Sequence, residues 1–338
     1  MKKYRKRMNT MKDIGYVIRR LFDMNYKAMF QKINAIHKKT GHSRLWILRD
    51  MQRCAVNYGA GYMDYDLFEM YNLTPEQRDT YLTRGRNNAL IRKYNDMTYG
   101  HCARNKGEFN TRFADYLKRE WVLLSEGEKA LEFMTRHDVF MAKPLNGTHG
   151  KGIEKIRMAE FSGPEAVREH LGSDEYLLEE LIIQNPVVGA IYPDAINTVR
   201  AVTIRKDGVT HVICTYFRIG NNGKHVDNFN NGGMVAPVDE KTGIVADRAI
   251  DKKKNLYAVH PQTGTPIKGF QFPDWEEAMD MVRSAAQRLP QLGYMGWDIA
   301  FSDKGPILVE GNEFPGHDIY QLPEHTPDKI GIMPKFNI

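Results

Sequence analysis

Apolar residues recur at helical spacing in the first part of the chain. The three-to-four-residue period is carried by Ile14, Val17, Ile18, Leu21, Phe22, Met29, Ile33 and Ile36. No strand pattern interrupts residues 4–94. Thr74 followed by Pro75 is typical of a helix start, because threonine caps free amide groups and proline is favoured at the first helical position. We therefore predict a helical region over residues 1–100, in which a helix begins at Thr74 and runs toward Asn95.

The pattern changes after Gly107, where short apolar and β-branched runs replace the helical period. Strands are predicted at 139–142, 176–178, 198–204, 209–216 and 307–310. Amphipathic helices are predicted at 164–171 and 274–289. This alternation predicts an α+β fold, divided into residues 101–183 and residues 184–338.

The composition is that of a folded globular protein, since 42% of the 338 residues are hydrophobic and 27% are charged. No apolar run approaches the roughly 18 residues of a membrane-spanning helix. The basic start has no apolar signal-peptide core behind it. Cys54, Cys102 and Cys214 are odd in number and far apart, which excludes a disulfide framework and metal-ligand spacing. We expect a cytoplasmic protein with reduced, buried cysteines.

The positive charge is concentrated at one end of the chain. Residues 1–44 contain 13 Lys or Arg against Asp13 and Asp23, a net charge of +11, which leaves −5 for the rest of a chain whose total is +6. Such a cluster fits an anionic membrane face, nucleic acid or an acidic polymer, or it is only the solvated face of a helix. Both interpretations stay open on these residues alone.

Lys143 stands at the end of a predicted strand, just before a glycine-rich loop. The loop residues are Gly147, Thr148, His149, Gly150, Lys151 and Gly152. Glycines let backbone amides approach phosphate oxygens closely, and a lysine at the strand end supplies a charge for them. The alternative is a purely structural turn. It is not a P-loop, because no Gly-Lys-Ser/Thr string follows.

Oxygen ligands gather on a second predicted hairpin. A turn at 302–305 joins two strands and brings Asp298 near Glu310, while Glu310 and Asn312 are two residues apart and so share one face of the sheet. Hard oxygen ligands of this kind suit Mg²⁺. The alternative is a set of polar residues on an exposed hairpin face.

Arginines on neighbouring strands form the third signal. Arg200 lies in the run Asn197-Thr198-Val199-Arg200, and Arg218 lies on the next strand. Planar guanidinium groups can hold a phosphoryl group or a substrate carboxylate with two parallel hydrogen bonds. They can also be paired surface charges, which is the commoner case.

The order of these elements resembles the ATP-grasp superfamily. Short strings resemble its sugar-transfer-associated branch in particular, namely Gln184-Asn185-Pro186, Asn197-Thr198-Val199-Arg200, Arg218-Ile219-Gly220, Val226-Asp227-Asn228, Gly232-Gly233, His260-Pro261-Gln262-Thr263-Gly264 and Gly296-Trp297-Asp298. The resemblance runs from about Tyr65 to Gly316 and implies two α+β subdomains that sandwich ATP, here with a helical N-terminal extension.

The resemblance also implies roles for individual residues. Lys143 would contact the nucleotide phosphates, and residues 147–152 would close over them. The adenine hinge would be Glu179, Glu180, Leu181 and Ile182, with Gln184 near the ribose and with Asp227 and Asn228 among the cofactor-binding residues. One or two Mg²⁺ ions would be held by Asp298, Glu310 and Asn312. Arg200 and Arg218 would stabilise an acyl phosphate and orient the acid. Lys106 is either a second phosphate lysine or only a helix-start residue.

Two features depart from the pattern of relatives. Several ligases have an arginine where Gly296 stands, so Arg200 or Arg218 must supply that charge if it is needed. The usual front domain is an α/β unit, whereas residues 1–94 are predicted to be helical.

The implied reaction is an ADP-forming ligation of a carboxylate to an amine or another nucleophile, using ATP and Mg²⁺. Phosphoryl transfer requires mainly positioning and charge neutralisation, which agrees with the lysines, arginines and oxygen ligands above. The resemblance suggests a sugar-derived or glycan-linked substrate, with no nucleic acid partner and with peripheral membrane contact through the basic N-terminal helix. A kinase of the same fold and a non-catalytic binder of a nucleotide or polysaccharide are the alternatives. His149 and His260 are acid–base groups, substrate contacts or surface residues.

Overall fold

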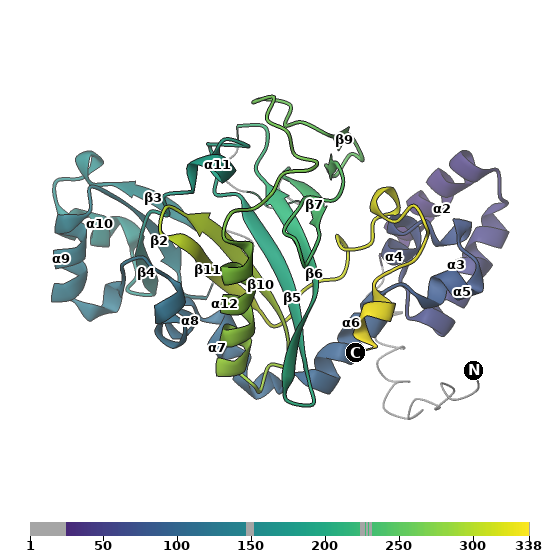
Figure 1. The fold of residues 1–338 in the computed structure, drawn as a ribbon, viewed down its shortest axis with the longest axis horizontal. Coiled ribbons are helices and arrows are strands. Elements are labelled where there is room, and N and C mark those ends of the chain that lie inside the picture. The colour runs from purple at the N-terminus through teal and green to yellow at the C-terminus, as the bar shows by residue number, and fades with distance from the viewer. Residues whose placement is uncertain (1–24, 147–151, 224–226, 228, 230–231, 338) are drawn as a thin grey trace.

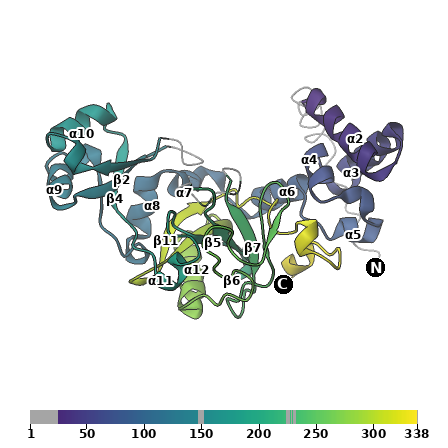
Figure 2. The same ribbon diagram turned by 90° about the horizontal axis from the view of Figure 1, so that it is seen from above.

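The computed structural model describes residues 25–146, 152–223, 227, 229 and 232–337. These residues form a helical region, a small four-stranded sheet and a large seven-stranded sheet. The helical region and the small sheet lie at opposite ends of the molecule, with the large sheet between them (Figures 1 and 2). The predicted α+β class is confirmed.

The helical region has its own hydrophobic core. Its helices are α2 (Tyr26–Thr40), α3 (Arg44–Tyr58), α4 (Tyr62–Leu67), α5 (Pro75–Asp79) and α6 (Arg84–Tyr94). Apolar side chains from α2 and α3, such as Ile33 and Ile47, pack with Phe68 and Tyr81 in one buried cluster. The predicted helical character of this part of the chain is confirmed within residues 25–94.

The prediction of one helix from Thr74 toward Asn95 was wrong. Thr74 does cap a helix, but α5 ends at Asp79 and Thr83 caps α6 as a new helix. The break lets Gly85 pack against Gly59, where a side chain at Gly85 would meet the Gly59 backbone at 2.8 Å. A continuous helix would not bring the two glycines together.

The small sheet carries the predicted phosphate lysine. Its antiparallel strands lie in the order β1-β4-β2-β3, with bounds β1 (Trp121–Leu123), β2 (Val139–Pro144), β3 (Glu154–Arg157) and β4 (Tyr176–Glu180). Its core includes side chains of α9 (Glu128–Arg136) and α10 (Pro164–Leu171). Phe133 of α9, for example, packs edge-on against Phe140 of β2, with 5.6 Å between ring centroids.

The large sheet is antiparallel throughout, in the order β11-β10-β5-β6-β7-β8-β9. Its strands are β5 (Thr198–Lys206), β6 (Val209–Ile219), β7 (Met234–Val238), β8 (Ala249–Ile250), β9 (Leu256–Tyr257), β10 (Tyr294–Ser302) and β11 (Gly305–Asn312). The remaining helices are α7 (His101–Arg104), α8 (Lys106–Arg112), α11 (Pro186–Gly189) and α12 (Trp275–Arg288). The core that α12, α7 and α8 share with this sheet contains one face of its strands, including Val199, Trp297 and Phe301.

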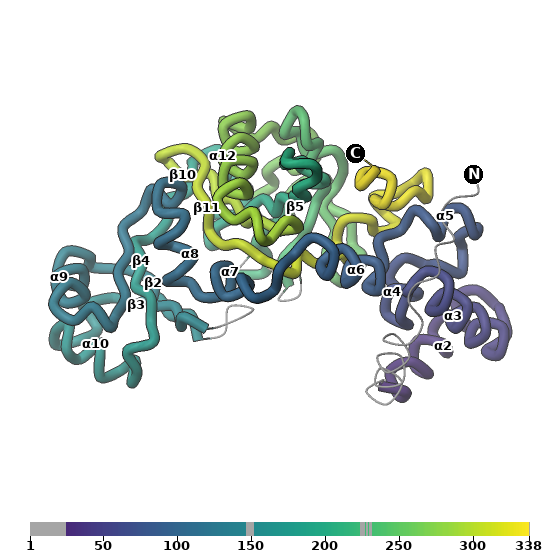
Figure 3. Tube along the Cα trace, turned by 90° about the horizontal axis from the view of Figure 1, so that it is seen from below, coloured from purple at the N-terminus to yellow at the C-terminus, as the bar shows by residue number. Residues whose placement is uncertain are grey.

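The division predicted at residue 101 differs from the observed packing. Phe109 of α8 and the following Phe113 belong to the core of the large sheet, and Phe113 contacts Trp297 edge-on at 5.5 Å between centroids. The core of the small sheet begins only at Val122. Figure 3 shows α6 and α7 leading from the helical region past the large sheet toward the small sheet. Residues 102–117 are therefore part of the large unit, because their apolar side chains face its sheet.

Polar contacts attach the helical region to the end of the chain. The side chain of Gln321 accepts a hydrogen bond from the Leu82 amide at 2.9 Å and donates one to the Leu82 carbonyl at 2.6 Å. His317 and Asp64 are joined at 2.8 Å. All four residues are buried, so the helical region has a defined position beside the large sheet.

Cys54, Cys102 and Cys214 are buried and form no disulfide, as predicted. None of the helices in the described part of the chain is both long and apolar enough to cross a bilayer.

A buried ion pair holds the helical region together. Arg78 donates two hydrogen bonds to Asp50, at 2.9 and 2.7 Å, and a third to the Met70 carbonyl, while the Tyr65 hydroxyl donates to Asp50 at 2.8 Å. Asp50 is 3% exposed. Arg53 also pairs with Asp50, at 3.6 Å, but its side chain is 65% exposed, so the buried charge depends mainly on Arg78.

We predict that Arg78→Met lowers the free energy of unfolding by about 3–5 kcal/mol, because the buried Asp50 carboxylate loses its cation. Urea unfolding followed by circular dichroism measures the change. Arg283→Met, which breaks an exposed ion pair with Asp280 on α12, is the control and should change stability by less than about 1 kcal/mol. Equal effects of the two variants would contradict this role for Arg78.

Candidate active site

A cluster of charged side chains occupies the face of the large sheet opposite α12. Asp298 on β10 lies directly between Arg200 of β5 and Glu310 of β11 in the strand register. Because side chains alternate along a strand, Asn312 shares this face with Glu310, and Arg218 of β6 shares it with Tyr216, the register partner of Arg200. The predicted proximity of Asp298 and Glu310 is thus observed.

Asp298 is buried and is held by two guanidinium groups. Arg200 bonds both of its oxygens, through Nε to Oδ1 and through Nη2 to Oδ2 at 2.9 Å. Arg218 donates to Oδ2 at 2.6 Å. Burial raises the pKa of Asp298, but the charges of Arg200 and Arg218 outweigh burial and hold that pKa well below its usual range. Asp298 is therefore ionised.

Asp227 holds Arg218 from the other side. Its Oδ1 accepts a hydrogen bond from Arg218 Nη2 at 3.1 Å, and its Oδ2 accepts from the amide and hydroxyl of Thr198. Burial raises the pKa of Asp227, against the opposing charge of Arg218. A side chain at Gly233 would meet the Asp227 carbonyl oxygen at 2.4 Å, which explains a glycine there. Asn228 lies outside the described residues.

The two remaining oxygen ligands are more accessible. The Glu310 side chain is 52% exposed, and Asn312 donates to its Oε1 at 3.3 Å. Partial desolvation raises the pKa of Glu310, and the neighbouring charge of Asp298 raises it further. Two crowded carboxylates and an amide oxygen are a donor set that suits Mg²⁺. Asp298 already accepts three hydrogen bonds, so about one of its roughly four lone-pair positions is left for an ion.

Gly296 makes room for Arg200. A side chain at Gly296 would meet Arg200 Cδ at 3.2 Å and Pro315 Cβ at 3.1 Å. The Arg200 side chain therefore crosses the space that a larger residue at position 296 would use. Whether Arg200 or Arg218 supplies the charge expected there stays a prediction.

The phosphate lysine predicted from the sequence is paired with the first residue of the predicted hinge. Lys143 Nζ bonds Glu179 Oε2, while Asn110 and Arg119 donate to Oε1 at 2.7 and 3.1 Å. Glu179 is 2% exposed. Burial raises its pKa, but the charges of Arg119 and Lys143 outweigh burial and hold the pKa well below its usual range. The carboxylate of Glu179 thus orients Lys143 in this structure, rather than facing an open site.

Arg119 connects the two sheets. One of its nitrogens bonds Glu179 in β4, and the other donates to the Leu308 carbonyl in β11 at 2.8 Å. Leu308 is two residues before Glu310. Neither Arg119 nor Asn110 was predicted from the sequence, because the string Lys118-Arg119-Glu120 before a strand carries no signal that separates Arg119 from surface charge.

Lys106 lies beside Lys143. Its Nζ donates to the Pro144 carbonyl at 2.8 Å. Burial lowers the pKa of Lys106, and so does the charge of Lys143, while Glu310 and Glu179 oppose the shift. The contact between the small-sheet group and the large sheet is made by Arg119, which bonds Glu179 of β4 and the Leu308 carbonyl of β11.

Glu180 of the predicted hinge, and Gln184 after it, form hydrogen bonds with other residues of the chain. Glu180 ends β4 and accepts a hydrogen bond from the Glu120 amide at 3.0 Å. Leu181 and Ile182 follow it and are half-buried. Both ends of the Gln184 amide bond Asn197, with its Nε2 donating to the Asn197 carbonyl at 2.8 Å. The ribose role of Gln184 stays a prediction.

Of the predicted glycine-rich lid, only Gly152 is described, and its φ of 72° is a conformation that favours glycine. Gly147, Thr148, His149, Gly150 and Lys151 lie outside the described residues. His260 is buried, and one of its ring nitrogens lies 3.0 Å from the Gly220 carbonyl. It is therefore neither an exposed surface residue nor part of the charged site.

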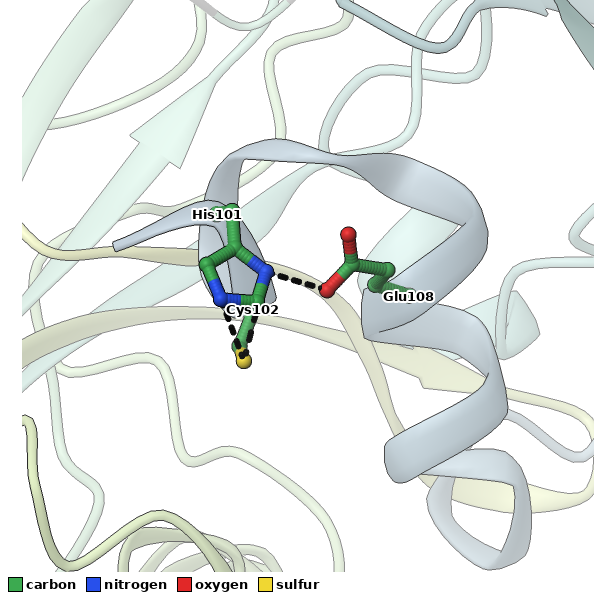
Figure 4. A group of neighbouring side chains, drawn as sticks. All are labelled: His101, Cys102 and Glu108. Atoms are coloured by element: carbon green, nitrogen blue, oxygen red, sulfur yellow. Dashed lines mark hydrogen bonds and ion pairs between the residues drawn. The ribbon is translucent and has the colours of Figure 1, made fainter. Parts of the chain in front are cut away.

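A second group of potential ligands lies at the start of α7 and α8 (Figure 4). His101 Nδ1 lies 2.5 Å from Glu108 Oε2, and Cys102 Sγ lies 3.8 and 3.9 Å from the two ring nitrogens of His101. A sulfur equidistant from both nitrogens is not aligned with the lone pair of either one. Arg112 also donates to this sulfur at 3.7 Å. The group is a hydrogen-bonded contact, and we assign no metal to it.

Comparison with known proteins identifies a family. A family model described as sugar-transfer associated ATP-grasp matches residues 86–327, more than two thirds of the chain. None of the curated proteins compared with the chain matches it.

Three solved structures illustrate the more distant similarity. D-alanyl-alanine synthetase A from Vibrio cholerae is 12% identical with a TM-score of 0.39, and 69% of this chain covers 58% of that one. D-alanine–D-alanine ligase from Bacillus anthracis is 10% identical with a TM-score of 0.40, and the match covers 70% of this chain and 65% of that one. N5-carboxyaminoimidazole synthase from Aspergillus clavatus is 11% identical with a TM-score of 0.41, and the match covers 65% of this chain and 46% of that one. This chain thus spans less than two thirds of each.

We predict that Glu179→Gln lowers the free energy of unfolding at pH 7 by about 3 kcal/mol, because Arg119 and Lys143 lose their counter-charge. A carboxylate with a depressed pKa stabilises the folded state above its unfolded pKa of about 4.3, and this contribution disappears as the pH falls below that value. The difference between wild type and variant should therefore be constant from pH 7 to 5 and shrink below about pH 4.3.

Urea unfolding across this pH range tests the prediction. Glu169→Gln, an exposed change on α10, is the matched control and should leave the curve unchanged. A wild-type minus E179Q difference that grows toward low pH would show that Glu179 is not the stabilising ionised group.

Proposed function

The chain belongs to the sugar-transfer associated ATP-grasp family, and on that basis we propose that it is an ATP-dependent ligase that activates a carboxylate. In the first step the γ-phosphoryl group of ATP is transferred to a carboxylate oxygen, which gives an acyl phosphate and ADP. In the second step an amine or another nucleophile attacks the acyl carbon, and phosphate leaves. We further propose that the carboxylate or the nucleophile belongs to a sugar or glycan precursor, as the family description suggests.

The observation that carries this proposal is the continuity of the basic and acidic groups. Lys143 lies on the small sheet with Lys106 bonded beside it, and Asp298 and Glu310 are register partners on the large sheet. Arg119 bonds both sheets and fixes their spacing at this point. A triphosphate needs this distribution, with cations along its oxygens and a metal site at one end.

The nucleotide would be bound mainly by charge. Glu179 orients Lys143, and the Pro144 carbonyl orients Lys106, so both ammonium groups are fixed before a phosphate arrives. Glu310, Asn312 and one lone pair of Asp298 would hold Mg²⁺, which neutralises charge on the transferring phosphoryl group. Preorganised charges of this kind need little rearrangement during the reaction.

The arginines would act on the substrate side. Arg200 and Arg218 are held rigidly by Asp298, and Asp227 holds Arg218 from behind. Their remaining N–H groups would orient the acid and stabilise the charge of the acyl phosphate. Asp298 would therefore both position the two arginines and bind Mg²⁺.

The proposal is tested by incubating the protein with MgATP, pooled amino acids and uronic-acid sugars. Release of ADP and phosphate together, with a mass gain in an acceptor, is the expected result, and hydroxylamine should trap the acyl phosphate. ADP release without free phosphate would instead indicate a kinase. Tight ATP binding without turnover under any acceptor condition would support the non-catalytic alternative and overturn the ligase proposal.

We predict that Lys143→Met and Glu310→Gln each lower kcat/KM for ATP by about 10²–10³, because each removes a charge aimed at the transferring group. The measurement is ADP formation in a coupled assay. Lys129→Met and Glu277→Gln, which alter exposed charges on α9 and α12, are matched controls with expected changes below about twofold. Loss of activity in the controls as well would point to a general effect on folding.

A further inference from the structure

We infer that the outer face of the α2–α3 hairpin is a docking surface for an anionic lipid bilayer. This inference goes beyond the proposed function and does not depend on it, because the hairpin precedes residue 86, where the family match begins. It rests on four features of the described residues, namely exposed apolar side chains, exposed arginines beside them, a surface depression between them and the position of the hairpin in the molecule.

Large apolar side chains on this face point into solvent. Leu45 is 56% exposed and Trp46 is 39% exposed, at the start of α3, and Phe30 on α2 is 52% exposed. Arg44 links the two helices here, because its Nε donates to Asn34 of α2 at 2.6 Å, one turn from Phe30. Leu45 and Trp46 are thus outside the core cluster that holds the helical region together.

Two basic residues of α3 lie on the same face of the helix as Leu45 and Trp46. Arg49 is four residues after Leu45 and Arg53 is seven after Trp46, so helical spacing places them beside the apolar pair. Leu45, Trp46, Arg49 and Arg53 line one surface depression of about 350 Å³, together with Ser43 and Asp50. The aromatic ring of Trp46 is stacked on His42, with 4.0 Å between centroids, which restrains its orientation.

Acidic residues cancel only part of this charge. Asp50 is the only acidic residue within α2 and α3, and it is bonded by Arg78 and also paired with Arg53 at 3.6 Å. Asp66 and Glu69 on the neighbouring segment are paired with Lys32 and Lys39. Arg44 and Arg49 have no ion pair with an acidic side chain in the described part of the chain, so their field extends into solvent.

A bilayer fits this surface better than a nucleic acid does. A phosphate backbone would be attracted by the arginines, but it offers no apolar layer for Leu45, Trp46 and Phe30. The interface of an anionic bilayer offers both, because phosphate headgroups lie above acyl chains and tryptophan is favoured at their boundary. The hairpin lies at the end of the molecule opposite the small sheet, so docking there leaves that sheet uncovered (Figures 1 and 2).

The experiment mixes the full chain with vesicles of phosphatidylcholine alone or with 30% phosphatidylglycerol, a composition chosen as roughly the charge density of an anionic leaflet. Trp46 is the reporter, since Trp275 and Trp297 are buried and Trp121 is half-buried. Anionic vesicles should shift the tryptophan emission to shorter wavelength, and brominated lipid should quench it. Trp46→Phe should remove both signals.

Two double variants separate charge from apolar contact. Arg44→Gln with Arg49→Gln should weaken binding to anionic vesicles about 30-fold, at roughly fivefold for each charge. Leu45→Asn with Trp46→Asn should weaken it at least about tenfold, because buried apolar area is lost. Lys252→Gln with Lys253→Gln, and Val209→Asn, alter exposed residues elsewhere and are the matched controls, with no expected change.

Thermal unfolding checks that the variants fold, and exposed positions should leave the melting temperature unchanged. The inference is overturned if anionic vesicles produce no Trp46 signal, or if the control variants weaken binding as much as the face variants. It is also overturned if the face variants weaken binding to duplex DNA or RNA while vesicle binding is absent.

Discussion

A carboxylate can be buried only if cations replace the water it loses, and this requirement organises the candidate active site. Two ionised carboxylates, Asp298 and Glu179, are almost fully buried. Arg200 and Arg218 surround the first, while Arg119 and Lys143 surround the second. Each carboxylate therefore fixes the positions of cations that would otherwise be long and mobile side chains. The cost of desolvating the acids is offset by these charges, and the result is a rigid set of ammonium and guanidinium groups.

The two centres belong to different sheets, and Arg119 makes them one site. It bonds the carboxylate of Glu179 and the backbone of β11 at once. The position of Lys143 relative to the strand that carries Glu310 is thus set by a buried contact rather than by a flexible linker. Such preorganisation is what phosphoryl transfer requires, because charges already in place stabilise the transition state without rearranging.

The helical region is attached to the large sheet by buried polar contacts rather than by apolar surface alone. Gln321 bonds both the amide and the carbonyl of Leu82, and His317 bonds Asp64. Among the described residues, Leu45 and Trp46 on the outer face of α2 and α3 are exposed and lie outside the core of the helical region. Exposed tryptophan and arginine side chains on this face are therefore available for a partner.

The sequence by itself determined the local elements and the order of the chemical groups. Helical periodicity located α2 and α12, the Thr74 cap marked a real helix start, and the two-residue spacing of Glu310 and Asn312 assigned them to one face. These features depend on neighbours within a few residues. The break between α5 and α6, the assignment of α7 and α8 to the large sheet, and the use of Glu179 by Lys143 were decided only by tertiary structure. Each depends on partners far away in the chain, as Arg119 shows, since its two partners lie 60 and 189 residues further along. A pattern of single residues does not encode such pairings, because burial and charge compensation exist only once the sheets have come together.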